Sequence, residues 1–169
     1  MLSLEVDDDA LYGAVANTLW RQRDLLEGLL HRLVGERLVL TNGATRWLAR
    51  ADDDVRAALD ELRCGEVARA IEVEALARHL GRDDEITLAE LAGAAPGIWA
   101  VLLTEHLTAL RQLAFEVQQA ADENHQLLAA GARAVRDTLA GIGSVVSIYD
   151  ANGAAVHGRP GAVLLDEQV

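Results

Sequence analysis

Two pairs of carboxylate and imidazole side chains have the spacing at which one face of a helix could present metal ligands. Glu27 and His31 are one turn apart, and Asp122 with His125 has the i, i+3 spacing of di-metal carboxylate sites in helical bundles. A di-metal site also needs a second such motif and further inward-facing glutamates, whereas the apolar seams of this chain are Leu, Val and Ala. We therefore expect no metal ion and no cofactor. The remaining histidines have no ligand spacing to one another and are expected in solvent: His79, His106 and His157.

Nucleophilic and nucleotide chemistry lack the residues that they need. No Ser, Cys or Thr stands beside a base on a sharp turn, where a nucleophile would be exposed. Gly141-Ile142-Gly143 is too short for a phosphate loop, and the chain has no lysine to hold phosphates. Cys64 is the only cysteine, so one chain cannot form a disulfide or a thiolate cluster. The sequence predicts no catalytic residues, and hence a protein that binds and is not an enzyme.

The charge of the chain restricts its partners and its location. A formal net charge of −12 argues against a nucleic-acid or anionic-membrane surface, because both need clustered cations. The first nine residues contain acidic side chains where a secretory signal would have basic ones followed by an apolar run. The longest uncharged stretch, 91–104, is interrupted by Pro96 and is shorter than the roughly 18 residues of a membrane span. We expect a cytoplasmic protein without direct membrane insertion.

A first helix is predicted from the acidic cluster 7–9 to the Asn-Gly pair at 42–43, where a left-handed cap can end it. Apolar residues along it recur at alternating spacings of three and four, as in a coiled coil. This seam consists of Tyr12, Val15, Leu19, Gln22, Leu26, Leu29, Leu33, Glu36 and Leu40.

A second helix is predicted from about Thr45 to Leu80, with Gly81 as its C-terminal cap. Its seam weakens in the middle, and a glycine in a helix interior costs about 1 kcal/mol relative to alanine, so we expect a soft point or bend near Gly65. The predicted seam consists of Leu48, Val55, Leu59, Leu62, Val73, Leu76 and Leu80.

A short helix and a last long helix complete the predicted fold. Thr87 and Glu90 have capping-box spacing, and Pro96 suits the first position of a helix that runs to about Ala140. The seam of this last helix reads Leu103, Leu107, Leu110, Ala114, Val117, Ala121, Asn124, Leu128, Gly131, Val135 and Thr138. Short loops make neighbouring helices antiparallel. We expect an all-α, long antiparallel coiled-coil-like bundle over residues 1–141, with three long helices and one short.

Residues 142–169 differ in character. Val145 to Tyr149 is β-branched and aromatic, and Asp150 to Gly153 is a turn signal. We expect a flexible tail or a small β-hairpin.

The last predicted helix carries two features that suit protein binding. Asn124 interrupts an apolar seam, so it either fixes register by finding a polar partner or lies just outside the packed region. Around and below it, apolar residues form a strip that could receive another amphipathic helix. These residues are Leu127, Leu128, Val135, Leu139 and Ile142.

The Asn-His-Gln-Leu-Leu segment 124–128, the glycine-rich joint and the Tyr-Asp-Ala-Asn-Gly segment 149–153 resemble the FlgN-type flagellar export chaperones. The resemblance implies a cytoplasmic chaperone that holds hook-associated (hook–filament junction) proteins by their C-terminal helical segments. It would prevent premature assembly and deliver them to the flagellar type III export apparatus for secretion.

The resemblance also implies roles for individual residues. Leu128, Val135 and Leu139 would grip the substrate, whereas Tyr149, with Asp150 and Gly153, would dock on the membrane protein of the export gate. The tail from Ala155 onward is longer than the family pattern. A self-associating structural or adaptor coiled coil, including a homodimer, is the main alternative, and a helical-bundle metalloprotein is a remote one.

Overall fold

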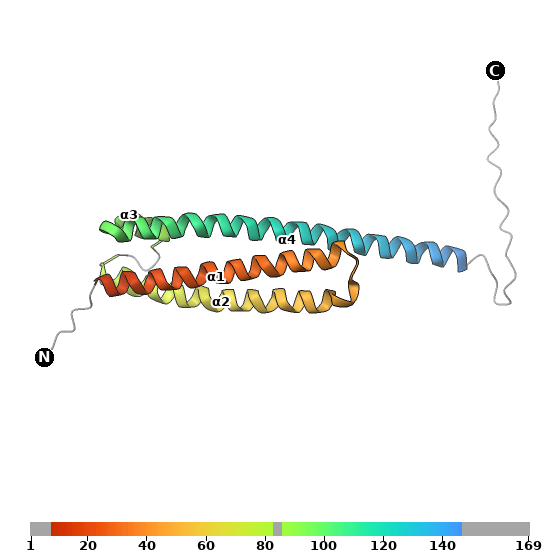
Figure 1. Ribbon diagram of the computed structural model, residues 1–169, viewed down its shortest axis with the longest axis horizontal. Helices are drawn as coiled ribbons and strands as arrows, with labels where there is room; N and C mark the ends of the chain where they lie inside the picture. Colours follow the sequence, from red (N-terminus) through yellow and green to blue (C-terminus); the bar gives the residue numbers. More distant parts are fainter. Residues whose placement is uncertain (1–7, 83–85, 147–169) are drawn as a thin grey trace, which may run out of the picture. The chain divides into compact units, whose positions relative to one another are not determined.

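All the regular structure that the computed structural model describes is helical (Figure 1). It describes residues 8–82 and 86–146, with side chains as far as Gly141. The elements are α1 (Asp8–Thr41), a 3-10 helix η1 (Thr45–Trp47), α2 (Leu48–His79), α3 (Leu88–Ala94) and α4 (Gly97–Val146). The all-α prediction is confirmed for these ranges, which contain no strand. None of their helices is long and apolar enough to cross a membrane.

The end of α4 corrects one prediction. We expected the helix to stop near Ala140 and Val145 to begin an extended segment, but α4 continues to Val146. The apolar period through Val135, Leu139 and Ile142 continues past the glycines, and the β preference of two valines is a weak prior beside it. Most of the predicted hairpin, from residue 147 on, lies outside the described residues. The predicted domain boundary at 141/142 stays a prediction.

Glycine caps end α1 and α2 as predicted. Gly43 and Gly81 both have φ of 64°, the left-handed region that glycine adopts without strain. After α1, the Ala44 amide donates to the Val39 carbonyl at 3.0 Å, and after α2 the Arg82 amide donates to the Ala77 carbonyl at 2.8 Å. These are the long-range bonds of Schellman caps, and they turn the chain back sharply at each end.

The capping box of α3 is confirmed. The Glu90 amide donates to the Thr87 hydroxyl at 3.2 Å, and the Thr87 amide donates to the Glu90 carboxylate at 2.8 Å. The Thr87 hydroxyl also donates to this carboxylate, at 2.7 Å, and the two hydrogen bonds that the carboxylate accepts favour its ionised form and lower the pKa of Glu90. A helix of seven residues is thereby fixed between α2 and α4.

The seam of α1 is the most accurately predicted part of the core. Every predicted seam residue from Tyr12 to Glu36 is buried, and Leu40 at the end is half-buried. The described chain divides into two compact units, 1–127 and 128–169, and the first is built around α1. Two apolar clusters lie along it, one with α2, α3 and α4 around Leu19, the other with α2 and α4 around Leu33.

The seam of α2 corrects a second prediction. Val55, Val73 and Leu76 are buried as predicted, but Leu59 is 36% exposed, and in the middle of the helix Ala58 and Gly65 are buried instead. A Cβ atom on Gly65 would lie 2.6 Å from the Leu25 side chain, so α1 and α2 approach closely there. The helix is unbroken through the glycine where we expected a soft point, and close packing against α1 explains the glycine.

Helix α4 follows a seam one residue out of phase with the predicted one over part of its length. Leu103 and Asn124 are buried as predicted, but His106 and Ala120 are buried where Leu107 and Ala121 were expected to point inward. Steps of four and three from Trp99 generate the observed line: Trp99, Leu103, His106, Leu110, Leu113, Val117, Ala120 and Asn124. The prediction placed the apolar Leu107 in the core and His106 in solvent.

Contacts at both ends of α1 show that α4 runs parallel to it. At one end Trp99 stacks on Tyr12, with ring centroids 5.6 Å apart, and its indole N–H donates to Asp9 at 2.6 Å. At the other end Asn124 contacts Glu36, a pair separated by 88 residues where Asp9 and Trp99 are separated by 90. The nearly constant offset fixes a parallel register. The expected antiparallel arrangement holds for α1 and α2, whereas the third long helix of an up-down-up chain returns to the direction of the first (Figure 1).

His106 lies in a polar layer along this interface and corrects the prediction that it is solvated. It is 1% exposed, and Trp20 meets its ring edge-on at a centroid distance of 4.9 Å. Neither ring nitrogen has a hydrogen-bond partner within the described chain, and the Arg23 guanidinium stacks on Trp20. Burial lowers the pKa of His106, and the Arg23 cation lowers it further, against the opposing effect of Glu105.

The His106 environment predicts loss of stability in acid. The folded-state pKa lies below the unfolded value of about 6.5, so the unfolded state binds the proton first and stability falls as the pH drops through that range. We expect His106→Leu to flatten the dependence of the urea midpoint on pH between pH 7.5 and pH 5. A single group contributes a slope of at most about 1.4 kcal/mol per pH unit. His125→Gln, at an exposed position, is the control; an unchanged slope in His106→Leu would contradict the assignment.

The contact between Asn124 and Glu36 predicts a second stability effect. Asn124→Ala removes the donor and leaves the buried carboxylate without it, which typically costs about 1–3 kcal/mol. Urea denaturation should show a lower midpoint with an unchanged slope. Gln118→Ala, which removes an exposed hydrogen bond within α4, should change the midpoint little. Equal midpoints for the two variants would show that Asn124 does not hold the register.

Candidate partner-binding surface

The second unit contains a continuous apolar stripe on α4. Leu128, Val135 and Leu139 are 39%, 60% and 62% exposed. With Ala132 between them, they are spaced by four, three and four residues, which places all of them on one face of a helix. Leu128, Val135 and Leu139 belong to the strip predicted from the sequence, and these three side chains are exposed in the structure.

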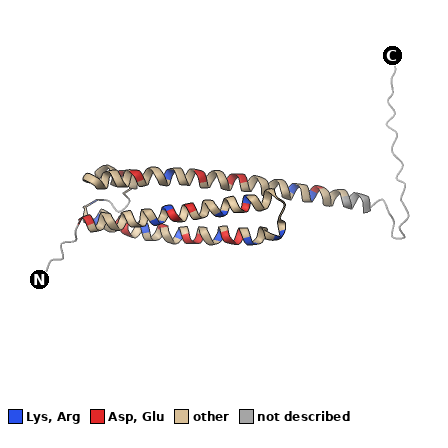
Figure 2. Ribbon diagram, in the orientation of Figure 1, with Lys and Arg blue, Asp and Glu red and all other residues tan. Residues whose placement is uncertain are grey.

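Charged residues of this stretch lie on other faces of α4. Only Arg133, Arg136 and Asp137 are charged between Leu128 and Gly141, and at 100° per residue none falls on the line of the stripe. Figure 2 shows charged residues along α1 and α2 and also along this stretch of α4. Arg136, four residues after Ala132, flanks the stripe. The stripe therefore offers an uncharged apolar surface of about three turns.

Asn124 belongs to the packed end of the first unit. Its side chain is 3% exposed, and its amide donates to the Leu33 carbonyl and to the Glu36 carboxylate, both at 2.8 Å. Arg37 and Glu123 form an ion pair beside it. Of the two interpretations from the sequence, the register-fixing one agrees with this geometry. The amide is occupied by α1, and Leu127 next to it is half-buried.

The other predicted site residues lie at or beyond the edge of what the structure describes. Ile142 belongs to α4, but its side chain lies outside the described part. Tyr149, Asp150 and Gly153, assigned to the export gate, lie outside the described residues. Their roles stay predictions.

The pairs Glu27/His31 and Asp122/His125 do not come together as one group of metal ligands. Within residues 8–82 and 86–141, no three His, Cys, Asp or Glu side chains gather as metal ligands would. The side chain of Asp122 accepts a hydrogen bond from Gln118 on its own helix.

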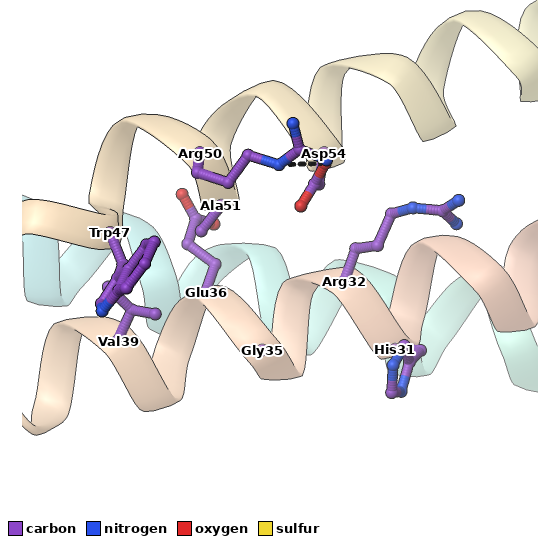
Figure 3. A pocket seen from close by; sticks show the side chains of 9 residues that line it. All are labelled: His31, Arg32, Gly35, Glu36, Val39, Trp47, Arg50, Ala51 and Asp54. Atoms are coloured by element: carbon purple, nitrogen blue, oxygen red, sulfur yellow. Dashed lines mark ion pairs between the residues drawn. The ribbon is translucent and has the colours of Figure 1, made fainter. Parts of the chain in front are cut away.

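Sequence reasoning did not single out Trp47. It is 53% exposed and lines a cavity of about 290 Å³ between the end of α1 and the start of α2 (Figure 3). Arg46 stacks on its ring, with the guanidinium carbon 4.7 Å from the ring centroid. The available signal was a tryptophan four residues after the capping Gly43, close to the turn between two predicted helices. A large ring so close to a turn has few neighbouring residues to cover it.

Comparison with known proteins identifies the family of the chain. The model of the family described as FlgN protein matches residues 11–157. No curated protein and no solved structure matches the chain. Because the family match spans most of the sequence, from the first turn of α1 into the tail, the chain belongs to the FlgN family of flagellar export chaperones.

Proposed function

We propose that this chain is a cytoplasmic chaperone for hook–filament junction proteins. It binds their C-terminal helical segments, prevents their premature assembly and delivers them to the flagellar type III export apparatus. Family membership supports the coarser role in flagellar export. The exposed stripe of Leu128, Val135 and Leu139 is the observation that supports the capture step.

Capture by the stripe would use the hydrophobic effect without nucleotide hydrolysis. A junction-protein terminus that is unpaired before assembly exposes the apolar face of an amphipathic helix, and the stripe can cover that face. Burying the exposed parts of the three large side chains contributes about 2–5 kcal/mol together. Association itself costs an estimated 4–15 kcal/mol, so the stripe alone is too small for a tight complex. Stable capture needs further contacts, from Ile142 and from surfaces elsewhere on the chain.

The tail is assigned a separate step in this proposal. Tyr149, with Asp150 and Gly153, contacts the membrane protein of the export gate, while the stripe holds the cargo. The resemblance of the segment 149–153 to the family supports this division. An aromatic ring is a compact anchor, since it offers a large apolar area with few rotatable bonds.

Substitutions on the stripe test the capture step. We expect Leu128→Glu with Val135→Glu to abolish co-purification with a hook–filament junction protein, because two carboxylates would be buried against the cargo helix. Helicity measured by circular dichroism should stay nearly unchanged, since both positions are exposed.

A matched control lies on the opposite face of the same helix. Ala130→Glu with Ala134→Glu adds the same charge at exposed positions and should leave capture intact. If both double variants bind the junction protein like the unsubstituted chain, the stripe is not the capture site. If the unsubstituted chain forms only homo-oligomers in the presence of junction protein, the self-associating coiled coil is the better explanation.

The tail assignment has its own test. Tyr149→Ala should bind the junction protein with unchanged affinity but reduce its secretion into the medium, whereas Tyr149→Phe should retain most secretion because the ring remains. Isothermal titration and secretion assays on the same variants separate the two steps. Loss of cargo binding in Tyr149→Ala would overturn the division between stripe and tail.

A further inference from the structure

A groove runs between α1 and α2 in the first unit, and it contains two cavities. One has a volume of about 740 Å³ and is lined by Arg21 and Leu25 from α1 and by Glu61, Cys64 and Ala68 from α2. The other, of about 290 Å³, lies at the end of the hairpin (Figure 3). There Arg32 and Val39 of α1 face Trp47, Arg50 and Asp54.

The two cavities belong to one groove because their lining residues follow heptad lines on both helices. On α1 the line steps by four and three through Arg21, Leu25, Gly28, Arg32, Gly35 and Val39. On α2 it steps by three and four through Trp47, Arg50, Asp54, Ala57, Glu61 and Cys64. Two parallel heptad lines on an antiparallel pair are the walls that a further helix would meet.

The groove opens away from α4 except at Glu36, which lines the smaller cavity and accepts a hydrogen bond from Asn124 of α4. At 100° per residue, its line on α1 lies roughly half a turn around the helix from Tyr12 and Arg37, which contact α4. In Figure 3, α4 (pale cyan) runs behind α1 and α2. Most side chains that line the larger cavity are exposed, among them Arg21, Glu61 and Cys64. The α1–α2 hairpin therefore has one face covered by α4 and the other uncovered within the described chain.

The shape of the groove suits a helix more than a small molecule. A Cβ atom on Gly35 would meet nothing within 4 Å, so the α1 wall is open there. Small residues, among them Ala57 and Ala68, let a neighbouring backbone come close to α2. At one end, the half-exposed Trp47 provides the kind of aromatic side chain that anchors protein interfaces.

Both walls carry charged side chains, and on α2 Arg50 and Asp54 pair with each other, so the charges left for a partner are arginines on α1 and a glutamate on α2. Arg21 and Arg32 on α1 form no ion pair within the described residues, and neither does Glu61 on α2. The two arginines are 11 residues apart, or about 16 Å along the helix. A helix lying in the groove would be favoured by carboxylates at that separation on the flank facing α1 and by cations on the flank facing α2.

From this geometry we propose that the α1–α2 groove binds one amphipathic helix of a partner protein. The occupant has an aliphatic seam, carboxylates about three helical turns apart on one flank, and basic residues on the other. The groove lies wholly in the first unit and does not depend on the stripe of α4. It gives the chain a second protein-binding surface beyond the capture site of the proposed function.

Cys64 provides a reporter for this test, since it is exposed, lines the groove and is the only cysteine. The full chain is labelled there with an environment-sensitive fluorophore. It is then titrated with a synthetic 25-residue amphipathic helix that has a Leu/Ala seam, two Glu residues 11 positions apart on one flank and Lys on the other. We expect saturable binding at 0.15 M salt, and at least tenfold weaker binding of a peptide with Lys in place of the two Glu residues.

Charge reversal in the groove should invert this preference. Arg21→Glu with Arg32→Glu is expected to bind the Lys-substituted peptide at least tenfold more tightly than the original one. The matched control, Arg82→Glu with Arg111→Glu, makes the same change of charge at exposed positions that form no ion pair within the described residues, and it should behave like the unsubstituted chain. Leu128→Glu with Val135→Glu should also leave peptide binding unchanged, so this test is independent of cargo capture.

Three results would overturn the inference. The first is equal affinity of the unsubstituted chain for the two peptides, and the second is the same inversion in the control variant. The third is a fluorescence change at Cys64 that grows with protein concentration alone, together with a dimer mass by sedimentation. That result would make a second copy of this chain the occupant.

Discussion

The Asn124 amide of α4 donates to the Leu33 carbonyl and the Glu36 carboxylate of α1, and these hydrogen bonds connect two helices that are far apart in the sequence. All three residues are buried, so a shift of α4 by one residue along α1 would leave a carboxylate and an amide without partners in an apolar environment. Apolar side chains tolerate such a shift far better, because one leucine replaces another. The register of the parallel pair therefore depends on this polar contact more than on the larger apolar area around it.

Helix α1 can take several neighbours because its faces differ in size and chemistry. Toward α2 it meets both large residues such as Leu76 and small ones, and at Gly65 an added Cβ atom would lie 2.6 Å from the Leu25 side chain, which would have to move. Toward α4 it presents large rings, Tyr12 and Trp20, which meet Trp99 and His106. Its third face carries glycines and two arginines that form no ion pair within the described residues; it contacts α2 at Leu25 and otherwise forms the open wall of the groove. A close pair with α2 and a wider, ring-filled interface with α4 leave a groove on the remaining side.

Much of the helical core could be predicted from the sequence because local signals and tertiary packing agree there. The capping residues Gly43, Gly81 and Thr87 act through local geometry, and the α1 seam is made of large residues whose period is unmistakable. Prediction failed where size misleads. At Gly65 and Ala58 the core uses small residues for close approach, and at position 106 a histidine is buried beside a leucine that is only half-buried. A single sequence cannot show how closely two helices approach, and that distance decides which of two adjacent residues points inward.

The candidate site could be predicted in outline for a related reason. An apolar strip on a helix is visible in the sequence, but its exposure depends on which neighbours reach it, and only the structure shows that Asn124 is covered by α1 whereas Val135 is exposed. The small area of the strip also has a functional consequence. A chaperone that must release its cargo gains nothing from one very tight contact. In the proposed capture, the stripe and a second weak contact elsewhere on the chain would bind the cargo together with useful affinity, because the first contact raises the effective concentration for the second. The complex with the cargo would weaken sharply once either contact is lost. Such an arrangement would allow release when the export apparatus competes for a single contact.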